Sequence, residues 1–316
     1  MSEWSPDLAG MAAWANVLRI VLRREAMPAH LSFSAAETWE DCHRKWAAKY
    51  VLYVPDEAGA AADIGKMAHL VLQGLGRFKA GRRTDEHAAV LAERAWAGKD
   101  DEKQAAAMGH VEAALTILEV SAGDVLRIEM DMDLVLAGVP FKGFLDRADE
   151  IPADVPGGIA ARVLDYKTGK RPGRRDWMAK KYRQLYLYAA GFETVTGIPV
   201  HEGAFVWTKT GKVDTIYIDA DGIGDTLDWF RSVWSGIRAA VEAYDFDADP
   251  GPLCSWCPVV QQCPEGTRAT IERHEKGKSI GEHGQPIIDA LQVAQFEDTL
   301  EAVEGRHLSV VEDPTV

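Results

Sequence analysis

The chain has 316 residues, a formal net charge of −14 and 47% hydrophobic residues. That length and apolar content are sufficient for a buried core, in one large domain or two small ones. Four cysteines are too few for a disulfide-stapled secreted domain, so ligand chemistry is the first role to consider for them. The apolar run 11–22 is too short to span a bilayer and carries no cleavage pattern, so we expect a cytoplasmic protein without a membrane role.

The charge is unevenly distributed along the chain. Residues 165–183 contain eight basic residues and two acidic ones, whereas residues 282–316 contain eight acidic residues and one basic. Distribution matters more than the sum for a nucleic-acid partner, because a basic groove can coexist with an acidic tail. The net charge alone therefore does not exclude DNA.

Helical patterns come first along the chain. Ser5-Pro6 begins a helix that reaches about residue 25, and Ser34 with Glu37 forms a capping box for a second helix through Trp46. Asp63 caps a third helix to about residue 78, and two more follow at about 84–97 and 101–121. The order of elements predicts a helical N-terminal part before the sheet.

Strand patterns follow at 125–135, 141–148 and 161–166, with a turn at Gly138-Val139-Pro140 between the first two. A helix at about 176–195 separates them from a hairpin, 203–208 and 213–218, that turns at Gly211-Lys212. We expect an α/β core of one domain, with a further helix at about 286–304.

Asp165 and Lys167 carry the first chemical signal. Residues separated by one in a strand point to the same face, so this carboxylate and ammonium project together. A carboxylate there can hold a divalent cation, and a lysine can position the attacking water. An exposed ion pair is the plain alternative. Asp146 strengthens the functional interpretation, because it lies inside the apolar run of the preceding strand, where a charge needs a partner or a metal. Asp149 follows that run, and we expect it to be a solvated residue at the strand end.

His69 is the third candidate ligand. On its helix it lies about 140° from the apolar stripe and beside Gly65 and Gly76, which favour close approach to another backbone. A surface histidine is the plain alternative. Further on, Gln184 and Tyr188 lie four residues apart on one helix face, which taken singly is ordinary helix surface or packing.

The cysteines give an independent signal. Cys254, Cys257 and Cys263 form a tight group, and Cys42 lies 212 positions before Cys254. Four thiolates suit a [4Fe-4S] cluster or a structural zinc ion. We favour the cluster, because zinc knuckles usually come as two balanced pairs, whereas here one cysteine joins a group of three.

Together these motifs resemble the RecB-like PD-(D/E)xK nuclease family, in a match that covers roughly residues 30–266. The resemblance is strongest to the iron-sulfur members, such as the AddB nuclease domain and the CRISPR-associated Cas-four exonucleases, many of them phage-encoded. It implies a restriction-endonuclease-like α/β core, a central mixed sheet flanked by helices, with an iron-sulfur clamp. One departure is His43 directly after Cys42, where many relatives have proline.

The resemblance also implies roles for residues. It assigns Mg²⁺ or Mn²⁺ binding to His69, Asp146, Asp165 and the Tyr166 carbonyl, and cluster binding to Cys42, Cys254, Cys257 and Cys263. It assigns catalytic or supporting roles to Asp146, Asp165, Lys167, Gln184 and Tyr188. The implied domain bounds are an N-terminal helix at 1–29, the nuclease at 30–266 and an acidic C-terminal tail at 267–316.

The activity implied is metal-dependent hydrolysis of DNA, by an exonuclease that prefers single strands, in recombination, repair or phage DNA processing. The basic run predicts DNA contacts, with a solvated helix face as the alternative; the expected residues are Lys170, Arg171, Arg174, Arg175, Trp177 and Lys181. No Walker A motif occurs, so a helicase or recombination partner would have to supply a motor. Two alternatives are a subunit that trims spacers in CRISPR adaptation and a non-catalytic DNA-binding scaffold.

Overall fold

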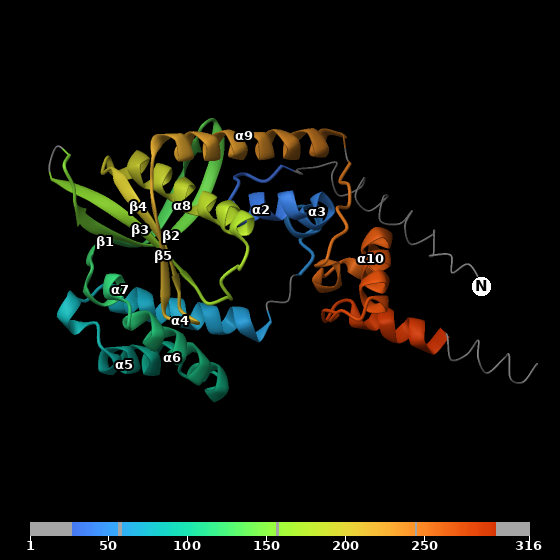
Figure 1. Cartoon of the computed structure of the whole chain (residues 1–316), viewed down its shortest axis with the longest axis horizontal. Helices are drawn as coiled ribbons and strands as arrows, with labels where there is room; N and C mark the ends of the chain where they lie inside the picture. Colours follow the sequence, from blue (N-terminus) through green and yellow to red (C-terminus); the bar gives the residue numbers. More distant parts are fainter. Residues whose placement is uncertain (1–26, 56–58, 156–157, 244, 295–316) are drawn as a thin grey trace, which may run out of the picture. The chain divides into compact units, whose positions relative to one another are not determined.

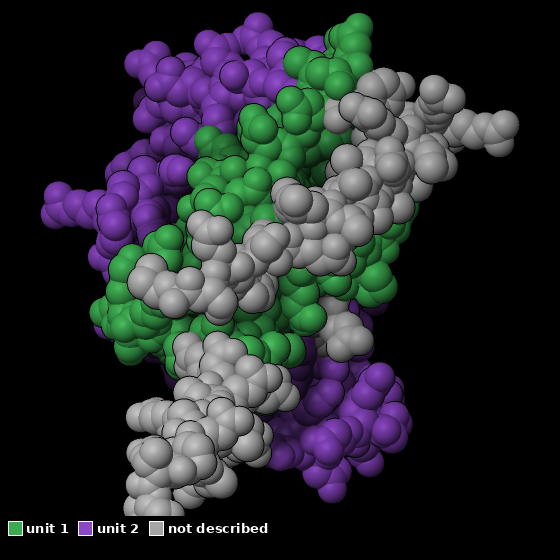
Figure 2. All heavy atoms as spheres, turned by 90° about the vertical axis from the view of Figure 1, so that its right-hand side faces the viewer, with its two compact units in different colours: residues 1–28, 37–57, 237–316 green, residues 29–36, 58–236 purple. Residues whose placement is uncertain are grey.

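The computed structural model describes residues 27–55, 59–155, 158–243 and 245–294. The chain divides into two compact units, coloured separately in Figure 2. Unit 1 comprises residues 1–28, 37–57 and 237–316, and unit 2 comprises residues 29–36 and 58–236. Unit 1 thus combines early and late parts of the chain. The three-part domain bounds expected from the sequence remain a prediction, and the helix expected at 5–25 lies outside the described residues.

Unit 2 is built on a five-stranded sheet with the order β1-β2-β3-β4-β5. The strands are β1 (Asp124–Leu136), β2 (Val139–Pro152), β3 (Ile159–Lys167), β4 (Val200–Trp207) and β5 (Lys212–Tyr217). The pair β3 and β4 is parallel, and the other neighbouring pairs are antiparallel. A parallel pair requires a crossover connection, which α8 (Arg175–Thr196) provides. The predicted α/β class with a mixed sheet flanked by helices is confirmed.

Helices cover both faces of this sheet (Figure 1). One face carries α4 (Ala60–Gly76), α5 (Asp85–Ala95), α6 (Asp101–Leu115) and α7 (Leu118–Ala122), with η1 (Ala80–Arg82) between α4 and α5. Their apolar side chains form one buried cluster with Leu164 and Tyr166 of β3 and with Ala204 and Val206 of β4. The alternate residues of β4 face α8, where Phe205 stacks on Tyr182. The strand ends are therefore held between two helical layers.

The turn between β1 and β2 sets the register of the two strands. It consists of Ala137 and Gly138, whose φ angles are 50° and 81°. Positive φ at both central residues is typical of the tight hairpin turn whose twist matches the strands. The predicted turn at Gly138-Val139-Pro140 was wrong, since Val139 and Pro140 already pair with β1. The hairpin is accordingly longer and its register is shifted.

Several helix boundaries differ from the sequence-based ones. The predicted second helix is two helices, α2 (Phe33–Asp41) and α3 (His43–Tyr50), because Cys42 is extended, with φ −172° and ψ 119°. The Ser32 hydroxyl accepts from the Ala35 backbone at 3.2 Å, so Ser32 caps α2 and Ser34 lies within it. The helix predicted at 101–121 is interrupted after α6. Asp63 lies inside the first turn of α4, whose N-cap is Gly59.

A 24-residue helix, α9 (Ala220–Ala243), was not predicted, although Phe230, Val233 and Ile237 are buried at helical spacing. Both α2 and α9 contain residues of the two units. Unit 1 also contains η2 (Cys254–Trp256), η3 (Val260–Gln262) and α10 (Pro264–Glu275). Residues 285–294 are helical, and the rest of the predicted C-terminal helix lies outside the described residues. None of the described helices combines the length and apolar character that a membrane span requires.

Candidate functional site

The end of β3 carries the predicted acid and lysine. Asp165 is 4% exposed, and its Oδ2 lies 2.7 Å from Lys167 Nζ. Burial raises the pKa of the Asp165 carboxyl, and the charge of Lys167 opposes that shift. The ion pair is therefore not the exposed contact that an accidental D-x-K motif would give.

Gln184 of α8 connects this pair to a buried tyrosine. Its Oε1 accepts a hydrogen bond from Lys167 Nζ at 2.8 Å. Its Nε2 donates to Asp165 Oδ1 at 2.7 Å and to the Tyr188 hydroxyl at 3.0 Å. Burial, followed by the charge of Asp165, raises the pKa of Tyr188, so this hydroxyl keeps its proton. One amide thus fixes the relative positions of the acid, the lysine and the tyrosine.

Asp146 lies where β2 diverges from β3, since the ladder between these strands ends at Arg147 and Leu164. Its Oδ2 accepts a hydrogen bond from the Tyr166 backbone N–H at 2.7 Å. That bond fills the opening between the strands and directs the other carboxylate oxygen toward α4. Asp146 and Asp165 are consequently brought to the same strand end from different strands.

His69 reaches both strands from α4. Its Nδ1 lies 3.4 Å from Asp146 Oδ1, and its Nε2 lies 3.0 Å from the Tyr166 carbonyl oxygen. Burial lowers the pKa of His69, but the hydrogen bond and charge of Asp146, then the charges of Asp165 and Glu129, raise it to about 9. Without a metal the ring is therefore protonated at neutral pH and donates from both nitrogens.

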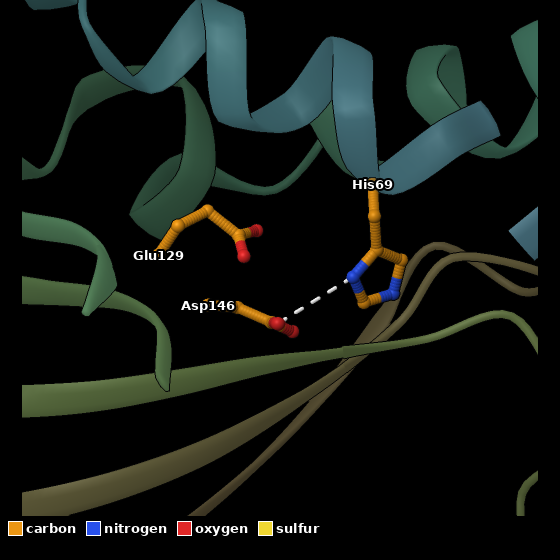
Figure 3. A group of neighbouring side chains, drawn as sticks. All are labelled: His69, Glu129 and Asp146. Carbon is orange, nitrogen blue, oxygen red and sulfur yellow. Dashed lines mark ion pairs between the residues drawn. The ribbon is translucent and has the colours of Figure 1, made fainter. Parts of the chain in front are cut away.

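Glu129 of β1 joins this group, which the sequence analysis did not predict. Figure 3 shows its carboxylate directed toward Asp146 and His69, and one ligand atom from each of the three side chains lies within 4.8 Å of the others. Burial, and then the charge of Asp146, raises the pKa of Glu129. Its φ of 46° is uncommon for a non-glycine residue inside a strand. A donor set of two carboxylates and one imidazole suits a divalent cation.

The hairpin register was the signal that could have found Glu129. The pairs Ile128–Arg147 and Met130–Leu145 flank it, so Glu129 lies opposite Asp146. A two-residue turn at 137–138 dictates that pairing. The turn predicted one to two residues later gives a different register, in which Glu129 does not lie opposite Asp146.

The prediction for Asp149 was wrong. Asp149 is 1% exposed and forms a bidentate pair with the buried Arg147, at 2.6 Å and 2.9 Å. Arg147 also donates to the carbonyls of Val120 and Glu119. The carboxylate is therefore satisfied by an arginine that lies two residues away on its own strand, and it is structural, not solvated.

The expected DNA-contact residues lie at the start of α8 and before it. Arg171 pairs with Asp214 at 2.6 Å and Arg174 with Asp176 at 2.7 Å, so part of their charge is already neutralised. The residues Lys170, Arg175 and Trp177 are exposed, and Lys181 is half-buried. Arg174 lies over the Trp177 ring at 5.6 Å.

The four cysteines all belong to unit 1 and line one pocket of about 400 Å³. Backbone N–H groups of Asp249, Gly251 and Gly266 donate to sulfur, at 3.4, 3.2 and 3.4 Å; the acceptors are Cys42, Cys254 and Cys263. Burial raises the pKa values of the Cys254 and Cys257 thiols. The pocket thus joins Cys42 to the distant group of three, as the sequence analysis expected, with hydrogen bonds aimed at sulfur.

Arg44 adds a charge to this pocket. Its Nη1 donates to Cys263 Sγ at 3.4 Å and to Glu265 Oε2 at 2.5 Å. The guanidinium therefore places one positive charge and one hydrogen-bond donor next to a candidate ligand sulfur. Sequence spacing gave no indication of Arg44.

Comparison with known proteins identifies the family. The model of the PD-(D/E)XK nuclease superfamily matches residues 30–264, so the chain belongs to that superfamily. Among solved structures, the chain is similar to a protein from Eubacterium rectale described as a "Putative exonuclease". The two share 15% identity over 81% of this chain and 92% of that chain, with a TM-score of 0.46. No curated protein matches the chain.

Proposed function

We propose that the chain is a metal-dependent exonuclease that hydrolyses the phosphodiester bonds of DNA and prefers single strands. The observation that carries the proposal is the meeting of Asp146, Asp165 and Lys167 at one strand end, within a nuclease superfamily match. Recombination, repair or phage DNA processing is the proposed setting, with any motor supplied by a partner protein.

A divalent ion fits the donor set at this strand end. His69, Asp146, Asp165 and the Tyr166 carbonyl are the groups that would hold Mg²⁺ or Mn²⁺, with Glu129 as an additional carboxylate. When bound, such an ion supplies Lewis-acid stabilisation and lowers the pKa of water. His69 must lose a proton to become a ligand. The carboxylates that stabilise the protonated imidazole would then interact with the cation.

Lys167 has a separate task. Its ammonium is held 2.7 Å from Asp165 and 2.8 Å from Gln184, so it needs no rearrangement before it donates a hydrogen bond to water or a phosphate oxygen. An ammonium has no lone pair, so Lys167 is not a metal ligand. Gln184 and Tyr188 orient the pair from α8.

The experiment compares linear DNA labelled at the 5′ or 3′ end with circular single-stranded DNA, each in Mn²⁺. An exonuclease degrades the linear strands progressively and leaves the circle intact. Asp165→Ala, in the same preparation conditions, controls for contaminating nucleases. Cleavage of the circle at a rate equal to that of linear DNA would refute the exonuclease assignment.

We also infer that the four cysteines hold a [4Fe-4S] cluster, which makes the chain an iron-sulfur nuclease of the AddB and Cas-four type. Two observations favour a cluster over zinc. Among the described residues, no three of the cysteines have sulfur atoms that all lie within 4.8 Å of one another. A tetrahedral zinc with Zn–S bonds of about 2.3 Å needs thiolates about 3.8 Å apart. The pocket of about 400 Å³ is also large for a single ion.

Anaerobic purification tests the cluster. We expect brown protein with iron and acid-labile sulfide in equal amounts, and Cys254→Ala should lose both. Asp165→Ala is the matched control and should keep the full iron content, because its site belongs to unit 2. Colourless protein with one zinc ion per chain is the result that would overturn the assignment.

A further inference from the structure

Thr208 follows β4 directly and binds the last residue of β3. The parallel ladder between these strands ends at the pair Lys167 and Trp207. The Thr208 backbone N–H then donates to the Lys167 carbonyl at 3.0 Å, and the Thr208 hydroxyl lies 3.2 Å from the same oxygen. Thr208 is 1% exposed, so water does not compete for these bonds. The carbonyl of the candidate catalytic lysine is therefore held twice by one residue.

His110 of α6 completes this contact, because its Nδ1 lies 2.9 Å from the Thr208 hydroxyl oxygen. In the 3.2 Å contact the hydroxyl donates its single proton to the Lys167 carbonyl, so it accepts from His110 Nδ1. The imidazole consequently carries hydrogen on Nδ1. Burial, and then the charge of Lys209, lowers the pKa of His110, which keeps the ring neutral and makes this tautomer the relevant one.

The hydrogen bonds from His110 to Thr208 and from Thr208 to Lys167 end at the residue that follows Tyr166, whose carbonyl is a candidate metal ligand. Successive carbonyls of a strand point to opposite neighbours, so a Lys167 carbonyl fixed toward β4 leaves the Tyr166 carbonyl on the β2 side, where the ladder with β2 has already ended. There the Tyr166 oxygen meets His69 Nε2 at 3.0 Å. On the next residue, Thr168 packs against Gly65, where an added Cβ would lie 3.0 Å from its hydroxyl. The end of β3 is thus held from both α6 and α4.

We propose that Thr208 and His110 are positioning residues that hold the last peptide of β3, and through it the Lys167 ammonium and the Tyr166 carbonyl, in the geometry required for hydrolysis. The inference rests on the proposed nuclease function. Neither residue touches the substrate in this account. Both act through the Lys167 backbone.

Thr208→Val keeps the side-chain shape and removes the hydroxyl, whereas Thr208→Ser keeps the hydroxyl. The matched control is Thr210→Val, since the Thr210 hydroxyl donates to the Trp207 carbonyl at 3.4 Å in the same turn. We expect Thr208→Val to lower kcat on the order of tenfold with KM unchanged, because small displacements of positioned groups are costly. Thr208→Ser should recover most of the rate, and Thr210→Val should lose little.

His110 has its own pair of variants. An asparagine amide can place an N–H near the position of Nδ1, so His110→Asn should keep more activity than His110→Leu. Equal kcat values for Thr208→Val and Thr210→Val would overturn the proposal. So would a loss in Thr208→Val that Thr208→Ser does not restore.

Amide hydrogen exchange keeps this test separate from the nuclease assignment. The segment 164–168 should exchange faster in Thr208→Val than in Thr210→Val or the parent protein, while segments outside the β3 end exchange at the parent rate in both variants. If the parent protein cleaves no DNA, the nuclease proposal fails, and the exchange rates still decide the positioning role. Unchanged exchange in Thr208→Val would refute that role.

Discussion

At the residue scale, the Gln184 side chain forms hydrogen bonds to three other candidate site residues. Its amide accepts from Lys167 and donates to Asp165 and Tyr188. Replacement by leucine would leave the buried Asp165 oxygen without this donor and the lysine without one of its two acceptors. The side chain therefore orients the candidate catalytic pair, Asp165 and Lys167.

We predict that Gln184→Leu lowers kcat by roughly 10- to 100-fold, while Tyr188→Phe, which removes one acceptor only, has a smaller effect. Steady-state kinetics on a labelled oligonucleotide measure both. If Tyr188→Phe proves as damaging as Gln184→Leu, the tyrosine hydroxyl has a role beyond its bond to Gln184.

His69 predicts a pH dependence of metal binding. Its pKa is about 9 in the metal-free protein against 6.5 ordinarily. The proton therefore stabilises the fold below pH 6.5, and this contribution disappears as the pH rises through 9. A metal must displace that proton at any pH below about 9, so Mn²⁺ affinity should rise about tenfold per pH unit up to pH 9 and then level off.

Binding isotherms with Mn²⁺ at several pH values, without DNA, test this. His69→Gln removes the titrating group and should flatten the dependence while weakening binding. An affinity that is constant between pH 6.5 and 9 in the parent protein would show that Mn²⁺ does not displace a proton from His69.

At the element scale, local pattern predicted most of the strands and helices, but it missed α9, several helix boundaries and the β1–β2 register. The strand with Asp165 and the crossover helix with Gln184 follow from alternation and helical spacing. Glu129 depends on a turn placed at the correct residues, and the pairing of Arg147 with buried backbone carbonyls depends on α7, which local patterns cannot locate.

The start of α8 offers a comparison between two adjacent arginines. Arg174 pairs with Asp176, whereas Arg175 is exposed and has no ion-pair partner among the described residues. We predict that Arg175→Gln weakens DNA binding more than Arg174→Gln and lowers the salt slope by about 0.7 for a single strand. Affinities measured over a range of salt test this, and equal effects of the two variants would argue that the Arg174 ion pair opens on DNA.

At the scale of the whole molecule, the chemistry is divided between the two units. The candidate metal ligands belong to unit 2 and the cysteine pocket to unit 1, although Cys42 precedes the entire sheet in the sequence. The number and spacing of the cysteines predicted that Cys42 joins Cys254, Cys257 and Cys263, because a group of three thiolates needs a fourth ligand and Cys42 is the only other cysteine in the sequence. The division into two units was not predicted, since the alternation of helices and strands was interpreted as one domain.

The central claim is that Asp165 holds a divalent ion for DNA hydrolysis. The direct measurement compares the parent protein with Asp165→Ala for Mn²⁺-dependent release of nucleotides from linear single-stranded DNA, with iron content and thermal unfolding measured on the same samples. We predict activity in the parent protein that EDTA abolishes, and a loss of at least about a thousandfold in the variant, with both samples folded and equal in iron. Retention of most of the activity by folded Asp165→Ala would contradict the account.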